Sequence, residues 1–152
     1  MATNMKRSLL FATLAASLLF FATPANAQSF GVRAGASADP DQFFFGGHYE
    51  TRPLMKNLTF RPNIEVGVGD DVTLVAFNIE FAYWIDLNNK PWKVYLGGGP
   101  AANLYDHDDN TDLQGGFNLM VGAQHRGGLF GEFKVGLIDS PDVKFTVGYA
   151  FK

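Results

Sequence analysis

All four glutamates of the chain, and several of its basic residues, fall in segments where polar and apolar residues alternate. If the polar sides of these segments face one another, carboxylates and cations lie together away from water. They then have to pair, because an unpaired buried charge is costly. We interpret the set as a structural polar plug, and the alternative is a salt-bridge network that rearranges to open an ion path. The predicted members of this interior network are Arg33, Glu50, Arg61, Glu65, Glu80, Lys93, Glu132, Lys134 and Lys144.

A second set of candidate ligands lies in the aspartate-rich segment 106–112, where oxygen-bearing side chains alternate as they do at the start of a calcium-binding loop. Thr111 stands where such loops need glycine, and Phe117 stands where they carry a bidentate glutamate. A solvated polar turn is therefore the favoured interpretation, with loose contact to a divalent ion as the alternative, and no defined metal site is predicted. The side chains concerned are Asp106, Asp108, Asn110 and Asp112.

Nucleophilic catalysis would need a serine, a histidine and an acid close together. The chain has three histidines. His48 stands on the polar side of its segment, and His125 lies beside a predicted turn. Only His107 lies in a predicted loop at the same end as a loop serine, Ser140. Because no histidine and serine pair on one strand, no residue is predicted to be catalytic, and the chain is predicted not to be an enzyme.

Eight alternating segments must position these side chains. The last is the clearest, since every second residue from Val143 to Phe151 is aliphatic or aromatic and those between are small or polar, the period of a strand. Short connections predict hairpins in an up-and-down order, and eight strands suffice to close a barrel. The predicted strands are 29–38, 42–50, 58–68, 72–85, 92–104, 113–125, 129–138 and 143–152.

Alternation alone does not decide which face is outside, because soluble lipocalin-like barrels and membrane barrels share it. Side-chain size is more informative. The polar face is rich in glycine, as at Gly35, Gly97 and Gly148, which suits a narrow interior better than a solvated β-surface. The bulky face carries no charge at its assigned positions, as contact with lipid requires. We therefore predict an all-β fold, an eight-stranded antiparallel up-and-down transmembrane β-barrel.

The acidic and basic residues outside the strands lie in different sets of connections. Those after the first, third, fifth and seventh predicted strands hold all but one of the aspartates. The intervening connections contain Asp86 as their only acid, together with the basic residues Arg52, Lys56, Lys90 and Arg126. Turn chemistry explains aspartate in loops but not its confinement to one set of loops. The sorting predicts one acidic and one basic end of the barrel.

The first 27 residues are a different kind of sequence. Lys6 and Arg7 precede an apolar run from Leu9 to Ala22, and small residues follow at 25–27. This pattern predicts a secretory signal peptide over 1–27 and a barrel domain over 28–152. The apolar run is shorter than the roughly 20 residues of a membrane-spanning helix. The chain has no cysteine, so an exported barrel has no disulfide to rely on.

The secretory signal, the eight-strand rhythm and the ending Val147, Gly148, Tyr149, Ala150, Phe151 resemble the small eight-stranded outer-membrane barrels of the OmpA/OmpX type. The resemblance covers the whole chain after the signal. In that family the last strand ends in an aromatic residue that the barrel-assembly machinery recognises. The resemblance therefore implies that Tyr149 and Phe151 serve as a membrane-interface and assembly signal, although here Lys152 follows the last aromatic residue.

The resemblance further implies a monomer in the bacterial outer membrane, exported with a cleaved signal peptide, with no cofactor and a structural or surface-interacting role. Its implied neighbours are outer-membrane lipid and lipopolysaccharide, whose phosphates divalent ions could bridge to the aspartate-rich segment. Two other classes stay open: a lipid A-modifying outer-membrane enzyme and a soluble periplasmic lipocalin-like barrel that binds a hydrophobic ligand. Nucleic acid is excluded as a partner by the net charge of −3.

Overall fold

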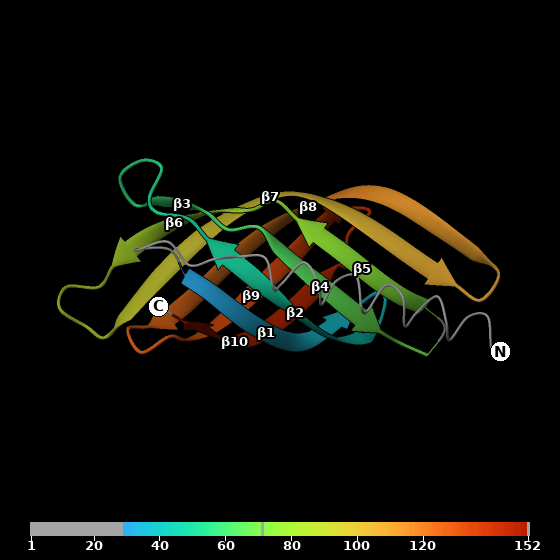
Figure 1. The fold of residues 1–152 in the computed structure, drawn as a ribbon, viewed down its shortest axis with the longest axis horizontal. Helices are drawn as coiled ribbons and strands as arrows, with labels where there is room; N and C mark the ends of the chain where they lie inside the picture. The colour runs from blue at the N-terminus through green and yellow to red at the C-terminus, as the bar shows by residue number, and fades with distance from the viewer. Residues whose placement is uncertain (1–28, 71, 152) are drawn as a thin grey trace.

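The computed structural model describes residues 29–70 and 72–151, and all of its regular elements are strands (Figure 1). The described residues include no helix long and apolar enough to cross a membrane. The predicted signal peptide and the final residue, Lys152, lie outside the described residues. The strands are β1 (Ser29–Ala38), β2 (Gln42–Glu50), β3 (Leu58–Phe60), β4 (Asn63–Val68), β5 (Val72–Asn78), β6 (Phe81–Asp86), β7 (Trp92–His107), β8 (Asn110–His125), β9 (Leu129–Ile138) and β10 (Val143–Phe151).

These segments form one closed barrel, because β1 pairs with β2 on one side and with β10 on the other, and every pairing is antiparallel. β3 and β4 together make one wall strand, and β5 and β6 make another. Hydrogen bonds carry the wall across both breaks, from Arg61 N to Glu80 O at 2.7 Å and from Ile79 N to Pro100 O at 2.9 Å. The predicted fold, eight antiparallel strands in up-and-down order, is confirmed.

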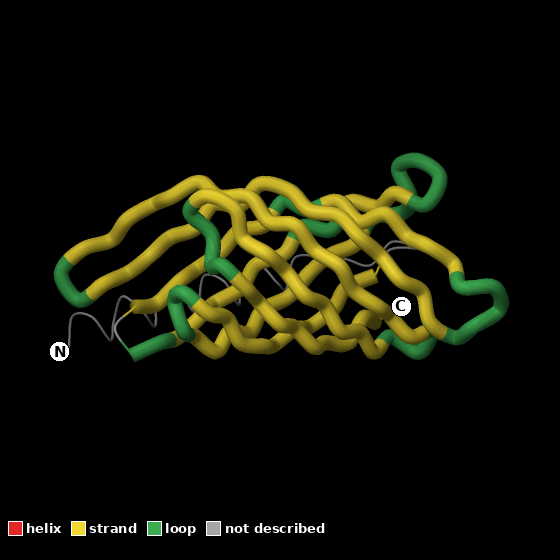
Figure 2. The backbone as a smooth tube through the Cα atoms, turned by 180° about the vertical axis from the view of Figure 1, so that it is seen from behind, coloured by secondary structure: helices red, strands yellow, loops and turns green. Residues whose placement is uncertain are grey.

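One predicted connection is wrong. The segment from Tyr105 to Asp112 is not a loop, since β7 and β8 are each 16 residues long and pair as far as His107 and Asn110. Only Asp108 and Asp109 make the turn, and the resulting hairpin extends past the rest of the barrel (Figure 2). Cross-strand pairing outweighs the turn preference of the aspartates here.

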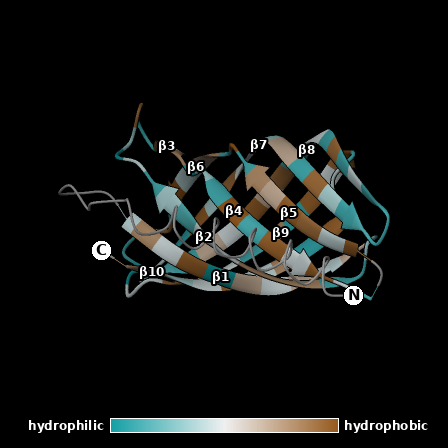
Figure 3. Ribbon diagram, turned by 45° about the vertical axis from the view of Figure 1, so that its right-hand side comes forward, coloured by the Kyte–Doolittle hydropathy of each residue, from teal (hydrophilic) through white to brown (hydrophobic). Residues whose placement is uncertain are grey.

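The barrel wall separates two kinds of side chain, and the alternation along each strand is visible in Figure 3. Large apolar side chains are exposed on the outer face, with Phe43, Phe145 and Val121 at 80%, 57% and 48% exposure. The interior holds charged and amide side chains, and Arg61, Glu80 and Lys134 are fully buried. Gln114 has the strand parity of the inner face, but it is exposed because it lies on the projecting hairpin, beyond the point where β8 meets β9.

Interior glycines make room for the few large rings inside. A Cβ added to Gly122 would collide with the ring of Tyr95, and one added to Gly148 would collide with Phe130. A Cβ at Gly31 would likewise collide with His48. The glycine-rich polar face thus fits a narrow interior in which each ring lies against a residue without a side chain.

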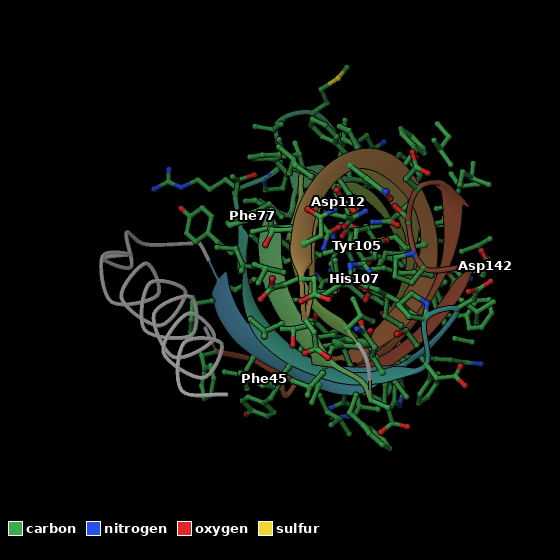
Figure 4. All side chains as sticks on the ribbon, turned by 90° about the vertical axis from the view of Figure 1, so that its right-hand side faces the viewer. Phe45, Phe77, Tyr105, His107, Asp112 and Asp142 are labelled. Atoms are coloured by element: carbon green, nitrogen blue, oxygen red, sulfur yellow. The ribbon has the colours of Figure 1, made fainter. Side chains whose placement is uncertain are left out.

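The two ends of the barrel differ in charge. We define the acidic end as the end formed by the connections after β1, β4, β7 and β9, and the basic end as the end formed by the connections after β2, β6 and β8. Figure 4 looks at the acidic end, with Tyr105, His107 and Asp112 around the opening and Phe45 and Phe77 on the outside. Near the basic end, Ser29 at the start of β1 pairs with Glu50, and Phe151 at the end of β10 pairs with Phe30.

The charged interior as candidate functional site

The interior network draws one or two residues from each of several strands. Facing positions on neighbouring strands bring two of them together, since Lys134 on β9 pairs with Lys144 on β10. Glu65 on β4 reaches the same level from across the barrel. Their inward direction follows from strand parity, because every second side chain faces the interior. The structure brings eight of the nine predicted members into one network, namely Arg33, Glu50, Arg61, Glu65, Glu80, Glu132, Lys134 and Lys144.

Glu65 contacts three buried cations, Arg33, Lys134 and Lys144. Its Oε1 lies 3.0 Å from Arg33 Nη1 and 3.4 Å from Lys134 Nζ. Its Oε2 accepts a short hydrogen bond from Lys144 Nζ. Glu65 is 1% exposed, so the charges of its three cations are balanced by protein groups rather than by water.

Lys134 is the corresponding cation. Its Nζ lies 2.9 Å from Glu80 and 3.5 Å from Glu132, in addition to its contact with Glu65. Since three carboxylates surround one buried ammonium, removal of any one of them leaves Lys134 with two.

A ladder of asparagines, whose members were not predicted as site residues, holds Glu80. Asn63 Nδ2 donates to Glu80 Oε2 at 2.7 Å, and Asn118 Nδ2 donates to Glu80 Oε1 at 3.3 Å. Asn78 links the two, donating to Asn63 and accepting from Asn118. The sequence signal for them is their strand parity, which places them on the same inner face as the charges.

Arg61 closes the network toward the basic end. Its Nε lies 3.6 Å from Glu50 and its Nη1 lies 3.7 Å from Glu132, while its guanidinium lies over the rings of Tyr95 and Phe130 at 4.7 and 4.8 Å. Tyr95 also donates to Glu132 at 2.6 Å. Neither ring was predicted as part of the site. Tyr95 shares the parity of the inward residue Gly97, which is the signal that could have identified it.

Lys93 is not part of the interior network, so this part of the prediction is wrong. Its Nζ lies 3.0 Å from Asp86, and both side chains are more than half exposed. Lys93 has the inward parity of Tyr95, but it is the second residue of β7, where the wall opens to solvent at the basic end. An exposed pair of this kind contributes little to stability.

A cavity of about 640 Å³ opens at the basic end. Its lining includes Glu50, Thr59, Trp84 and Gln124. Thr59 Oγ1 donates to Glu50 and accepts from Trp84 Nε1, both at 3.0 Å. Glu50 contacts Arg61, which lies against the rings of Tyr95 and Phe130. The cavity is therefore a vestibule that ends at the charged network.

The other predicted site residues lie near the two ends. Tyr105 pairs with Asp112, and Asp106 accepts from Thr111 at 2.8 Å, so the aspartate-rich segment forms two paired strands and a turn. Within residues 29–70 and 72–151, no three His, Cys, Asp or Glu side chains are grouped so as to hold a metal ion. Contact between Asp106, Asp108, Asn110, Asp112 and a divalent ion or lipopolysaccharide stays a prediction.

The terminal aromatics and the loop serine are also placed. Tyr149 and Phe151 lie on the outer face with ring centroids 5.1 Å apart. Their role as an assembly signal stays a prediction. Ser140 is buried, and its Oγ accepts from Asn103 Nδ2 at 3.2 Å, so this hydroxyl is engaged with the barrel interior.

Comparison with known proteins supports the fold. No family model and no curated protein sequence matches the chain. Among solved structures, the N-terminal β-barrel domain of Pseudomonas aeruginosa OprF is 14% identical with a TM-score of 0.56, covering 81% of this chain and 97% of that one. Neisserial surface protein A (NspA) is 17% identical with a TM-score of 0.62, covering 82% of this chain and 94% of that one. The chain therefore has the fold of these barrels, as the sequence resemblance predicted.

Proposed function

We propose that this chain is a small, monomeric barrel of the bacterial outer membrane with a structural or surface-interacting role and a plugged interior. The observation that carries the proposal is the distribution of side chains, with ion pairs inside and exposed aromatic and aliphatic residues around the outer wall. Soluble proteins rarely expose apolar surfaces of this extent. A soluble barrel that binds a hydrophobic ligand would need the opposite arrangement.

In the proposed orientation the acidic end faces outward and the basic end faces the periplasm. Lipopolysaccharide is then the neighbour of the acidic end, and any loose bridging of its phosphates by divalent ions would involve Asp106, Asp108, Asn110 and Asp112. Tyr149 and Phe151 lie at the periplasmic edge of the wall, where interfacial aromatic residues are common and where the assembly machinery would meet the last strand.

Cell fractionation tests the membrane proposal. We expect the protein to fractionate with outer membranes and to migrate differently in detergent gels before and after boiling, because a closed barrel resists detergent until heated. Recovery in the soluble periplasmic fraction would refute the proposal. The proposal assigns no catalytic residue, so the mass of lipid A should be the same with and without the protein, and a mass change would favour the enzyme alternative.

Glu80→Ala tests whether the interior is a structural plug. We expect the free energy of unfolding to fall by about 1 to 3 kcal/mol, because Lys134 keeps Glu65 and Glu132 while Asn63 and Asn118 lose an acceptor. Conductance across a planar bilayer should change little, since the remaining side chains still fill the barrel. Large open channels in the variant would instead favour a gated ion path.

A further inference from the structure

The connection between β2 and β3, residues 51–57, is a rigid hairpin rather than a loose turn. Thr51 N donates to Phe60 O at 3.0 Å, Leu54 N donates to Leu58 O at 2.8 Å, and Leu58 N donates to Met55 O at 3.1 Å. Asn57 adopts a positive φ of 65°, and its carbonyl accepts from Trp84 N at 2.7 Å, which ties the hairpin to β6. We call residues 51–57 the basic hairpin.

The basic hairpin projects sideways from the barrel wall instead of continuing along the barrel axis, as Figures 1 and 2 show from opposite sides. For a barrel in a membrane, a sideways projection at one end lies over the surface of the surrounding leaflet. The hairpin base continues into the apolar outer wall, where Leu58 pairs with Tyr83 and the rings of Phe60 and Phe81 are 5.2 Å apart.

The tip of the basic hairpin combines two exposed apolar side chains with two flanking cations. Leu54 is 58% exposed and Met55 is 69% exposed, while Arg52 and Lys56 stand on either side of the apolar pair. Turns that only need solvation favour glycine, asparagine and aspartate, and the turn at the acidic end of β7 follows that rule with Asp108 and Asp109. The composition of the basic hairpin is instead that of an interfacial membrane contact, apolar residues beside basic ones.

We propose that the basic hairpin is a binding site for anionic phospholipid headgroups in the leaflet next to the basic end. Leu54 and Met55 enter the apolar edge of the leaflet, and Arg52 and Lys56 bind headgroup phosphates. Basic side chains beside an anionic lipid surface gain about fivefold each in binding. The inference rests on the proposed membrane location and adds to it a lipid preference at the periplasmic side.

Single-site labelling tests this proposal, because the chain has no native cysteine. Met55→Cys carries an environment-sensitive fluorophore, and the protein is refolded into vesicles of phosphatidylcholine alone or with one third phosphatidylglycerol. A water-soluble quencher reports how much label is shielded. We expect stronger shielding at residue 55 in vesicles with phosphatidylglycerol. Arg52→Gln or Lys56→Gln should each lower the ratio of shielded to exposed label about fivefold, whereas Arg52→Lys should not.

Two reference labels separate the possible failures. Lys90→Cys lies on another connection of the basic end and should stay open to the quencher, whereas Phe133→Cys on the outer wall should be shielded in both kinds of vesicle. If residue 55 is as open as residue 90, or is shielded equally with and without phosphatidylglycerol, the headgroup site is refuted while the membrane proposal stands. If residue 133 is also open to the quencher, the membrane proposal itself fails.

Discussion

Replacing Glu65 with alanine is expected to lower the free energy of unfolding by about 3 to 5 kcal/mol, because it strips a carboxylate from three buried cations. Arg33 and Lys134 keep contacts with Glu132 after the change. Lys144 loses the carboxylate that its ammonium contacts, and it is only 3% exposed, so water cannot replace that partner without opening the wall. Urea unfolding of the barrel in lipid vesicles measures the effect.

Three further variants identify the cause of the loss. Glu65→Gln keeps the size of the side chain and should recover only part of the stability. Adding Lys144→Met to Glu65→Gln should recover more, since the unpaired ammonium is gone and an unbranched chain still packs near Phe44. The matched control is Asp86→Ala, which breaks the exposed pair with Lys93 and should cost less than about 1 kcal/mol. Equal losses for Glu65→Ala and Asp86→Ala would contradict the role of burial.

The membership of the interior network was predictable from strand parity, because a period of two decides which side of a wall each residue faces. Parity places Glu65, Lys134 and Lys144 inside, and the structure buries all three. It fails for Lys93 and Gln114, both of which have inward parity but lie where the wall ends. Strand parity decides whether a side chain points to the inner or the outer face. Burial of an inward side chain also requires neighbouring strands on both sides at the same position along the barrel axis.

The pairing within the network could not be predicted. Glu65 on β4 meets Lys134 on β9 across the interior, 69 residues apart in sequence. Which carboxylate reaches which cation depends on the stagger between strands, and the stagger is fixed only when the barrel closes. The sequence therefore identifies the charges that must pair, and the three-dimensional register decides the partners.

The sequence did not predict the break between β3 and β4, the break between β5 and β6, or the long β7–β8 hairpin. Pro62 interrupts one predicted strand because it lacks an N–H, yet its carbonyl still accepts from Tyr49 N at 3.0 Å. In the hairpin, the aspartates suggested a loop, but Tyr105 and Asp106 find partners in Asp112 and Thr111. Local preference is weak evidence where cross-strand partners are available.

The second large effect is expected for a charge placed on the outer wall. Phe133 lies at the middle of β9, is 42% exposed, and pairs with Val121 on one side and Phe145 on the other. In a bilayer, Phe133→Lys should lower the free energy of unfolding by about 2 to 4 kcal/mol, because it exposes an ammonium to hydrocarbon near the midplane. Reversible urea unfolding in phosphatidylcholine vesicles gives the value.

Position along the barrel axis provides the control for this prediction. Leu113 is 71% exposed but lies on the projecting part of β8, beyond the first residue that pairs with β9. Leu113→Lys should therefore cost only about 0 to 1 kcal/mol, the value for a cation near or outside the interface. Phe133→Leu controls for the loss of the ring and should cost less than the lysine. If Phe133→Lys and Leu113→Lys lower the free energy of unfolding by the same amount, the exposed apolar wall does not face hydrocarbon. The membrane proposal then fails, because that wall is the observation on which it rests.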